Sequence, residues 1–540
     1  MTEVYSCGER LVELLEAYGI DTVFGIPGNH TVQLYRGLAR SRIRHISPRH
    51  EQGAAFMADG YARATGRPAA CFLITGPGVG NAVTPMMQAL GDSIPMLVIS
   101  AVAARRQLGM GEGRLHELPD QRALVSQCTR FSHTLMEAED LPRVLARAFS
   151  IFDGARPGPV HVEIPLDVIT ADAPPLSPWG RISAPMASLD AIDALASKLV
   201  GARAPCLIAG GGAVGAADEI RRLAEAIGAP VVTTTNGKGV LPEAHPLLAA
   251  GSPSLPSVRA LIAESDVVFA IGTEFGETDY DMLFLGEPAK PAWLARLDIE
   301  PQQLARGLAA DLPMCGDAAA SLRALQERLP DATPEDGEKR AVALRRAVAD
   351  EEHVHPDMAA FFALLKESLP GLCLVGDSCL PTYYAVWQYE APMPRRYFHS
   401  ATGAGTLGYA IPAAIGARRA LPPEVPVVAL IGDGAAQFTL MELGAAVQEG
   451  LAVIVLVWNN AGYREIKAGM IAAEVEPVGV DINPPDFVAA ARALGCSALR
   501  VSSQDELAAA LTDAASRAAP TLLELPESDF VSGPVGTWYE

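Results

Sequence analysis

The sequence has little of what marks secreted, zinc-bound or membrane-spanning proteins. Its 540 residues include only eight cysteines, which are scattered and form no CxxC pair. This pattern is typical of reduced thiols in a cytoplasm and gives no sign of a structural zinc site. Residues 1–19 predict an amphipathic helix with acidic side chains, unlike a signal peptide. No run of about 18 apolar residues lacks charges or helix breakers, so we expect a cytoplasmic protein without a membrane span.

Positive charge is also in short supply. Lysine and arginine total 42 residues against 63 acidic ones, which gives a formal net charge of -21. Phosphate backbones repel such a chain, so we do not expect nucleic-acid binding. Charged residues make up 19% of the sequence and hydrophobic ones 49%, the balance of a well-buried globular protein. The length is sufficient for three domains of ordinary size.

Alternating strand and helix signals divide the chain into three units. We expect an α/β fold with three doubly wound domains and mostly parallel sheets. The predicted boundaries are 1–175, 189–330 and 355–540, and the proline- and serine-rich stretch 172–188 is interpreted as a linker. In the first unit, a helix is predicted from about residue 51 and a glycine turn at 76–81, with strands at 22–25, 43–47, 70–75, 95–100 and 159–164.

The central unit contains a glycine pattern that is common to nucleotide sites and to tight turns. Gly210, Gly212 and Gly215 satisfy GxGxxG after a predicted strand. No acidic residue closes the next predicted strand, 231–235, which is followed by Asn236. We therefore favour a tight turn and leave a dinucleotide site open.

The third unit contains the stretch on which the functional interpretation depends. Apolar runs at 425–431 and 452–458 predict neighbouring parallel strands, joined by a helix at 441–449. Gly432-Asp433-Gly434 ends the first strand and Asn459-Asn460 ends the second, so both turns lie where open α/β sheets bind ligands. Asp433, Asn460 and the carbonyl of Gly462 are hard oxygen ligands suited to Mg²⁺. Gly434 would let backbone N–H groups approach a phosphate.

Three segments in this order resemble thiamine-diphosphate (ThDP) enzymes of the 2-oxo acid decarboxylase and acetohydroxyacid synthase group. They are GDG at 432–434 followed by NN at 459–460, RHEQGAAFMADGYAR at 49–63, and AGTLGYAIPAAIG at 404–416. The resemblance extends over essentially all 540 residues. It implies a pyrimidine-binding, a central and a diphosphate-binding domain. It also implies a homodimer or homotetramer whose sites combine Glu51 of one chain with Asp433 of another.

The resemblance assigns cofactor roles to individual residues. Glu51 would bond N1′ of the aminopyrimidine and so favour the imino tautomer that removes the thiazolium C2 proton, an intramolecular step. The Gly405 carbonyl would accept from N4′, and Leu407 would hold the cofactor bent. The diphosphate would be bound by a set of small residues, Gly432, Gly434, Ala435 and Ser378, with Mg²⁺ on Asp433, Asn460 and Gly462.

Candidate substrate contacts are less constrained. Asn29 and His30 follow the Gly-Ile-Pro-Gly turn, and His116 lies in the segment LHELPDQ. A histidine in either place could move protons near neutral pH or hold a carboxylate. Glu117, Asp120 and Glu465 could pair with a guanidinium group. Arg130 would instead favour a second carboxylate if it lay at the substrate channel.

Within the group, several stretches most resemble decarboxylases of 5-guanidino-2-oxopentanoate, among them 23–45 and 115–123. We therefore expect a Mg²⁺- and ThDP-dependent decarboxylase that converts this 2-oxo acid of arginine catabolism to 4-guanidinobutanal. A carboligase that joins the decarboxylated acid to a second carbonyl is the alternative, and a silent ThDP- or nucleotide-binding regulator is a more distant one. Glu274 and residues 463–466 stand where an acetohydroxyacid synthase would carry arginine and tryptophan, which disfavours acetolactate synthesis and bound FAD.

Overall fold

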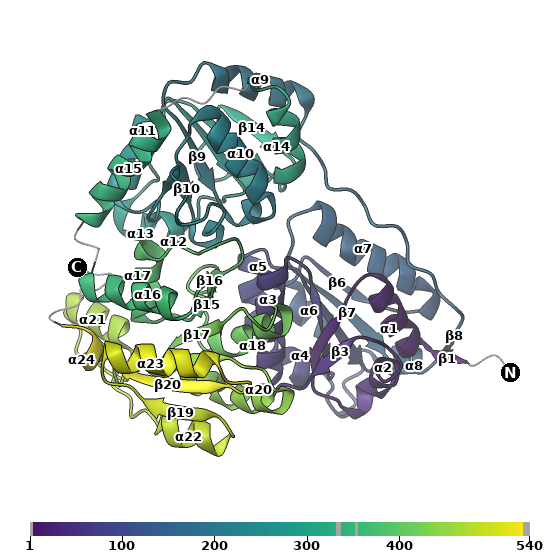
Figure 1. Cartoon of the computed structure of the whole chain (residues 1–540). Coiled ribbons are helices and arrows are strands. Elements are labelled where there is room, and N and C mark those ends of the chain that lie inside the picture. The colour runs from purple at the N-terminus through teal and green to yellow at the C-terminus, as the bar shows by residue number, and fades with distance from the viewer. Residues whose placement is uncertain (1–3, 331–335, 352–354, 533–540) are drawn as a thin grey trace.

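The chain folds into three α/β units, each built on its own parallel sheet (Figure 1). The structure is a computed structural model that describes residues 4–330, 336–351 and 355–532. Apolar strands rich in branched side chains form the sheets, and amphipathic helices cover both faces, as the sequence predicts. No helix in these ranges is long and apolar enough to cross a membrane.

The first unit contains a six-stranded sheet in the order β3-β2-β4-β5-β7-β6. Its strands are β2 (Thr22–Gly25), β3 (Arg44–Ile46), β4 (Ala69–Leu73), β5 (Met96–Val102), β6 (Phe131–Thr134) and β7 (Pro159–Pro165). Every predicted strand is present, and β6 is additional. The helices are α1 (Cys7–Ala17), α2 (Val32–Leu38), α3 (Glu51–Thr65), α4 (Pro77–Asn81), α5 (Val83–Gly91), α6 (Gln121–Ser126), α7 (Leu141–Gly154) and α8 (Leu166–Ile169).

One local prediction in this unit is wrong. Residues 76–81 were expected to be a glycine turn, but α4 begins at Pro77 and continues into α5 after a single residue, Ala82. Proline is pre-organised for the first position of a helix, so the turn is reduced to Gly76, whose φ is +69°.

The central unit has a sheet in the order β11-β10-β9-β12-β13-β14. Its strands are β9 (Pro205–Ala209), β10 (Val231–Thr233), β11 (Leu248–Ala249), β12 (Val267–Ile271), β13 (Leu294–Asp298) and β14 (Leu312–Cys315). Its helices are α9 (Leu189–Val200), α10 (Ala217–Ile227), α11 (Pro256–Glu264), α12 (Glu277–Tyr280), α13 (Met282–Leu285), α14 (Ala318–Gln326) and α15 (Asp336–Ala349). A Cβ at Gly210 would lie 2.3 Å from the carbonyl oxygen of Gly272, so this glycine is explained by a close backbone approach.

The third unit has a sheet in the order β16-β15-β17-β18-β20-β19. Its strands are β15 (Cys373–Gly376), β16 (Tyr397–His399), β17 (Val427–Gly432), β18 (Ile454–Asn459), β19 (Ser497–Arg500) and β20 (Thr521–Pro526). Its helices are α16 (Pro356–Ser368), α17 (Leu380–Gln388), α18 (Ala410–Ala420), α19 (Asp433–Thr439), α20 (Leu443–Glu449), α21 (Arg464–Ala472), α22 (Phe487–Ala493), α23 (Gln504–Ala515) and α24 (Glu527–Phe530). The predicted parallel pair is β17 and β18. The helix between them begins at Asp433, earlier than predicted, with a 3-10 turn at Leu440–Glu442.

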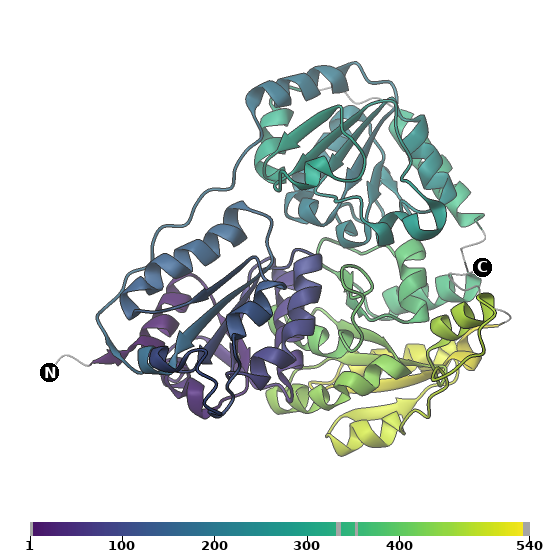
Figure 2. The ribbon, with the colours of Figure 1, turned by 180° about the vertical axis from the view of Figure 1, so that it is seen from behind.

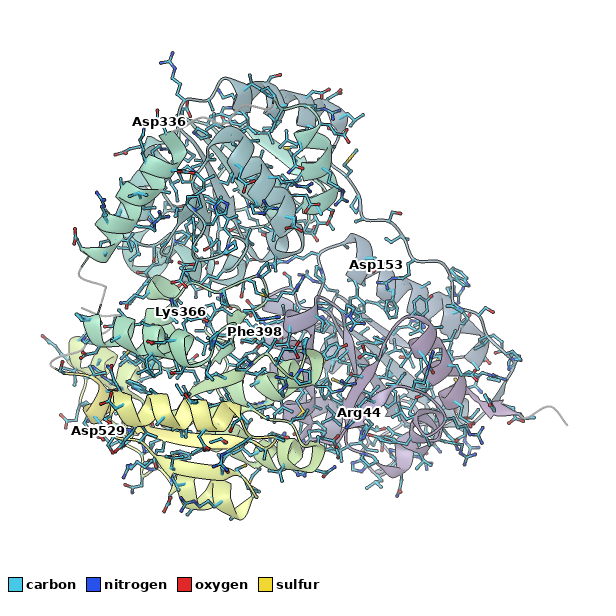
Figure 3. The ribbon with its side chains drawn as sticks, viewed as in Figure 1. Arg44, Asp153, Asp336, Lys366, Phe398 and Asp529 are labelled. Atoms are coloured by element: carbon cyan, nitrogen blue, oxygen red, sulfur yellow. The ribbon has the colours of Figure 1, made fainter. Side chains whose placement is uncertain are left out.

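The first and third units share one hydrophobic core. Helices α3 and α18 pack so closely that a Cβ at Gly60 would lie 2.0 Å from the Ala413 carbonyl oxygen. Arg44, labelled in Figure 3, adds an ion pair of 3.4 Å with Glu449 across the same junction. The first and third units are therefore fixed relative to each other within the chain.

A long connection leads from the first unit to the central one. A short antiparallel pair, β1 (Tyr5–Ser6) and β8 (Asp172–Ala173), closes the first unit. Residues 174–187 then run without regular structure over the outside of the molecule to α9, as Figures 1 and 2 show. The backbone of Trp179 exchanges hydrogen bonds of 3.1 Å with the Tyr18 hydroxyl, which holds part of this connection to the first unit.

Candidate functional site

Glu51 is the first residue of α3 and lies at a hollow of about 220 Å³. Its Oε2 accepts a hydrogen bond of 2.9 Å from the side-chain amide of Asn81. The other lining residues come from the turn after β2 and from the strands and loops beside it: Ile26, Pro27, Gly28, Asn29, His30, Ile74, Leu115 and His116. The structure thus places Asn29, His30 and His116 around one hollow with Glu51. Asn81 was missed by the sequence analysis, although it ends the glycine-rich segment that precedes it.

His30 and His116 contact each other at this hollow. Their rings meet edge to face with centroids 5.6 Å apart, and Nδ1 of His30 lies 3.2 Å from the Thr75 hydroxyl. Burial lowers the pKa of His30, and the neighbouring His116 lowers it further. Both effects favour the neutral form of the His30 ring. His116 has φ of +63°, and its carbonyl oxygen fits against Gly76, where a Cβ would lie only 2.4 Å away.

Asp433 and Asn460 lie at the carboxyl ends of the neighbouring strands β17 and β18. Oδ1 of Asp433 accepts a hydrogen bond of 3.4 Å from the Asn460 backbone N–H. Oδ2 of Asp433 and Oδ1 of Asn460 are both buried and, within the described residues, have no hydrogen-bond partner. Burial raises the pKa of Asp433, and nearby backbone N–H groups oppose this shift.

These two oxygens fit a magnesium site. The amide nitrogen of Asn460 donates to Glu527 Oε2 at 3.1 Å, which fixes the amide with its oxygen free. Mg²⁺ prefers oxygen ligands and neutralises buried carboxylate charge. No group of three or more histidine, cysteine, aspartate or glutamate side chains arranged for a metal occurs in the part of the chain that the structure describes. The expected set of one carboxylate, one amide and the Gly462 carbonyl does not need such a group.

The glycines around Asp433 have different surroundings. Gly432 precedes α19, and Ala435 is buried in its first turn. A Cβ at Gly434 would lie 2.5 Å from the ring of Tyr463, so the aromatic ring of the next loop explains the glycine. This packing is a second reason for glycine here, besides the phosphate approach that the sequence predicts.

The segment before α18 contains Gly405 and Leu407. Gly405 has φ of +63°, and the Ser400 hydroxyl donates to the Thr406 carbonyl at 2.6 Å. Leu407 is half-buried and packs against the core that the first and third units share. In this segment the Gly405 backbone is in the left-handed region, and the Leu407 side chain packs against the core.

Asp377 connects Ser378 to this segment and was missed by the sequence analysis. Its carboxylate is fully buried and accepts hydrogen bonds from the backbone N–H groups of Ser378 at 2.9 Å and Ala410 at 3.0 Å. Burial raises its pKa to about 6. The sequence does contain a pattern that points to Asp377. Gly376-Asp377 stands at the end of β15 as Gly432-Asp433 stands at the end of β17.

Two of the three carboxylates that could pair with a guanidinium group accept hydrogen bonds from nearby backbone N–H groups instead. Glu117 accepts from the backbone N–H groups of Gly111 and Arg114, both at 2.9 Å. Asp120 caps α6 by accepting from the Ala123 N–H at 2.8 Å. Glu465 lies in the first turn of α21 and is half-buried.

Arg130 is not among the residues that line the Glu51 hollow. The charged groups near it include Arg156 of the first unit and Glu274 and Glu300 of the central unit. The effect of this cation on a guanidinium substrate stays a prediction.

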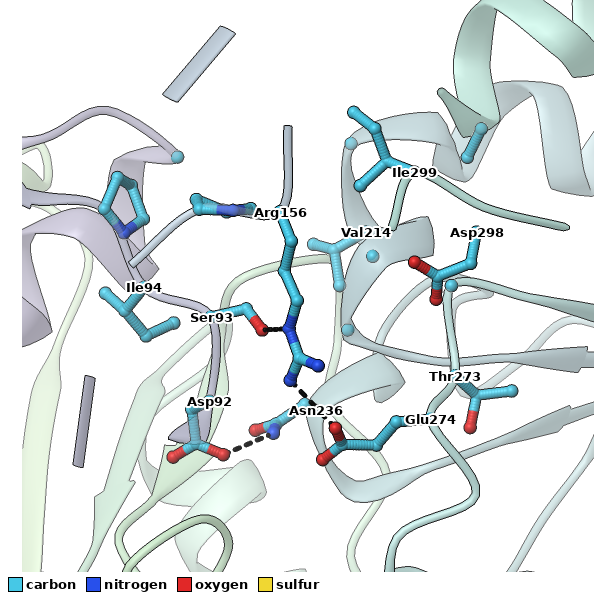
Figure 4. Close-up of a pocket in the computed structure, with 18 of the residues that line it drawn as sticks. Asp92, Ser93, Ile94, Arg156, Val214, Asn236, Thr273, Glu274, Asp298 and Ile299 are labelled. Atoms are coloured by element: carbon cyan, nitrogen blue, oxygen red, sulfur yellow. Dashed lines mark hydrogen bonds and ion pairs between the residues drawn. The ribbon is translucent and has the colours of Figure 1, made fainter. Parts of the chain in front are cut away.

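A separate hollow of about 350 Å³ lies where the first, central and third units meet (Figure 4). Arg156 crosses it, donating to the Ser93 hydroxyl at 2.7 Å and to Glu274 at 2.8 Å. Asn236 donates to Asp92 at 3.0 Å beside this ion pair. No residue lines both this hollow and the one at Glu51.

Comparison with known families agrees with the three-unit fold. Models of the thiamine pyrophosphate enzyme domains match the chain in order: the N-terminal binding domain at residues 6–124, the central domain at 192–325 and the C-terminal binding domain at 377–525. The chain belongs to the thiamine pyrophosphate (that is, thiamine diphosphate) enzyme family and is a ThDP-dependent enzyme.

Curated relatives fall into two groups by their names. The chain is 41% identical to the probable 2-ketoarginine decarboxylase AruI of Pseudomonas aeruginosa, over 96% of this chain and 94% of that protein. It is 30% identical to the probable acetolactate synthase large subunit of Methanocaldococcus jannaschii, over 96% and 91% of the two chains. It is also 30% identical to the acetolactate synthase isozyme 3 large subunit of Escherichia coli, over 95% and 92%.

Proposed function

We propose that this enzyme decarboxylates a 2-oxo acid non-oxidatively to an aldehyde, with ThDP and Mg²⁺, and that its substrate is 5-guanidino-2-oxopentanoate. The observation that carries the cofactor part is the pair of unpartnered buried oxygens on Asp433 and Asn460. The substrate part rests on the higher identity to a probable 2-ketoarginine decarboxylase than to acetolactate synthases, since 2-ketoarginine is the same compound. The product would be 4-guanidinobutanal. We propose that this aldehyde is an intermediate of arginine catabolism and that the enzyme acts in the cytoplasm.

The cofactor contacts in this proposal are residues of this sequence, supplied together by two copies of the chain. Glu51, held by Asn81, would bond the aminopyrimidine, and the Gly405 carbonyl and Leu407 would hold its other side. Asp433, Asn460 and the Gly462 carbonyl would bind Mg²⁺, while Gly432, Gly434, Ala435 and Ser378 would surround the diphosphate. ThDP, when bound, supplies the carbon nucleophile and the electron sink that decarboxylation requires.

Substrate handling would fall to the residues around the Glu51 hollow. Burial lowers the pKa of His30 and favours its neutral form, which can accept a proton or pass one on through the Thr75 hydroxyl. Asn29 and His116 would orient the carboxylate and carbonyl of the 2-oxo acid. The described lining contains no acidic residue apart from Glu51, so a guanidinium tail would extend out of this hollow.

Self-association is part of the proposal. Large apolar side chains remain exposed on the segments that follow Asp433 and Asn460: Phe438, Met441, Ile466 and Ile471 are all more than half exposed. Such side chains beside a site are typical of a subunit interface. We propose a homodimer or homotetramer in which Glu51 and Asp433 of different chains share one cofactor, with domains at 1–175, 189–330 and 355–540.

A carboligase is the second candidate, because relatives at 30% identity are named acetolactate synthases. Product mass spectrometry separates the two. The purified protein with ThDP and Mg²⁺ would be given 5-guanidino-2-oxopentanoate, pyruvate, benzoylformate and a branched 2-oxo acid separately. We expect an aldehyde from the guanidino acid and little from the others. A larger ligated product from pyruvate would favour the carboligase, and no product from any acid would contradict the proposed substrate class.

A further inference from the structure

Gln88, on α5 of the first unit, forms all of its side-chain hydrogen bonds with one loop of the third unit and with Asp92. Its amide nitrogen donates to the Thr402 carbonyl at 2.8 Å and to Asp92 Oδ2 at 2.6 Å. Its amide oxygen accepts from the Thr406 backbone N–H at 3.2 Å and from the Thr406 hydroxyl at 2.9 Å. A carboxamide has two N–H groups and two acceptor sites, so this fully buried side chain is completely satisfied.

The loop between Thr402 and Thr406 is also held from within the third unit, where the Ser400 hydroxyl donates to the Thr406 carbonyl at 2.6 Å and the Gly405 N–H donates to the Thr402 carbonyl at 3.3 Å. It contains Gly403 and Gly405, both with positive φ, and nothing lies within 4 Å of a Cβ placed at Gly405. Glycines of this kind leave a loop free to adopt several shapes. Gln88 is the side chain of the first unit that bonds both ends of the loop, immediately before Leu407.

The orientation of Gln88 is itself fixed by charge. Asp92 accepts from Arg63 at 2.6 Å, and Arg63 also pairs with Asp59 at 2.7 Å. Arg63 and Asp59 are buried, so this ion-pair network cannot rearrange without a large cost. Because Asp92 is an acceptor, the Gln88 nitrogen must face it and the oxygen must face Thr406.

We propose that Gln88 is a positioning residue of the cofactor site, which holds the Gly405 carbonyl and Leu407 in the shape that receives the aminopyrimidine. This inference rests on the proposed cofactor contacts of Gly405 and Leu407. Gln88 itself touches no cofactor or substrate atom in this proposal and acts through the loop.

The variant Gln88→Met tests the inference, since methionine has a similar length and volume but forms no comparable hydrogen bonds. Thr406→Val is a milder second variant that removes only the hydroxyl. The affinity for ThDP with Mg²⁺ would be measured by quenching of intrinsic fluorescence, and near-ultraviolet circular dichroism would report the state of the bound aminopyrimidine. We expect Gln88→Met to weaken ThDP binding about tenfold, the scale of a lost buried hydrogen-bond set, and to lower kcat with little change in the KM of the 2-oxo acid.

A matched control is Gln326→Met. It removes the hydrogen bond of 2.6 Å that the Gln326 side-chain amide donates to the Glu219 carbonyl in the central unit. It should leave the ThDP affinity unchanged. The double variant Gln88→Met/Thr406→Val should weaken binding by less than the product of the single effects, because both remove one shared contact. Wild-type ThDP affinity and kcat in folded Gln88→Met would overturn the inference. If Gln88→Met does not fold, an unchanged affinity in Thr406→Val overturns it. Failure of the wild-type protein itself to bind ThDP would instead contradict the proposed function.

Discussion

The carboxylate of Glu442 accepts a hydrogen bond of 3.0 Å from the backbone N–H of His50, although the two residues belong to different units. It also accepts from the Arg49 N–H at 2.9 Å. His50 is the residue directly before Glu51, so a side chain of the third unit holds the start of α3. A Cβ at Gly53 would lie 2.3 Å from this carboxylate, which explains the glycine in the first turn of α3.

This contact has a consequence for stability. Burial raises the pKa of Glu442 from 4.5 to about 7, even though backbone N–H groups oppose the shift. The folded protein therefore binds this proton more tightly than the unfolded chain does. Its contribution to stability is complete below about pH 4.5 and is lost as the pH rises through 7. This pKa shift corresponds to a change in the free energy of unfolding on the order of 3 kcal/mol between low and high pH.

We predict that Glu442→Gln reduces the loss of stability between pH 5 and pH 8. The amide cannot ionise, so the cost of a buried charge at high pH disappears. The measurement is the melting temperature of the cofactor-free protein at several pH values, in parallel with the wild type. The control is Glu13→Gln, because Glu13 forms an exposed ion pair with Arg10. Melting curves of wild type and Glu442→Gln that shift equally with pH would contradict the assignment.

Glu51→Gln should abolish most of the activity while the protein stays folded. Asn81 can still donate to the amide oxygen introduced by the substitution, so the local contact of 2.9 Å is retained while the charge is lost. A lost acid–base function typically lowers the rate by about 10² to 10⁴-fold. Steady-state kcat, together with circular dichroism and ThDP affinity, checks this expectation. Turnover near that of the wild type would refute the proposed role in activating the cofactor.

Asp433→Asn should separate stability from cofactor binding. Oδ2 of Asp433 has no partner among the described residues and burial raises its pKa, so a neutral side chain removes a cost from the cofactor-free protein. We expect an unchanged or higher melting temperature without Mg²⁺. The affinity for ThDP with Mg²⁺ should fall by at least about 100-fold, as measured by titration calorimetry. Tight, Mg²⁺-independent ThDP binding by the variant would argue against the metal site.

The parts of this structure that the sequence predicted are those set by local pattern. The apolar runs of β17 and β18 lie between turn residues, and parallel pairing then brings Asp433 beside Asn460. Helix α19 was missed because Gly-Asp-Gly is common in turns, and here it begins a helix directly after the strand. Asn81, Gln88 and Glu442 could not be recognised, since their partners lie 30, 318 and 392 positions away in the sequence. Their roles depend on how the units pack.

Glu117 lies close to the proposed substrate site, and its role in recognising a guanidinium group can be tested. Glu117 is the acidic residue next to His116, yet its carboxylate is bonded by backbone N–H groups of Gly111 and Arg114. These bonds lower the pKa of Glu117 and order the loop that carries His116. We therefore expect Glu117→Gln to raise the KM of all 2-oxo acids by the same modest factor, roughly two- to threefold, because the loop loosens. The measurement compares 5-guanidino-2-oxopentanoate with 2-oxopentanoate, which has the same chain length and no cation.

The control for this comparison is Glu112→Gln, whose carboxylate pairs with Arg114 at 2.7 Å in the same loop without accepting the bonds that order it. It should leave both KM values unchanged. A rise in KM for the guanidino acid alone in Glu117→Gln would show instead that Glu117 binds the guanidinium group. In that case the carboxylate would have to leave its backbone partners when substrate arrives, because a carboxylate already bonded to three N–H groups has little capacity left for a bidentate guanidinium pair.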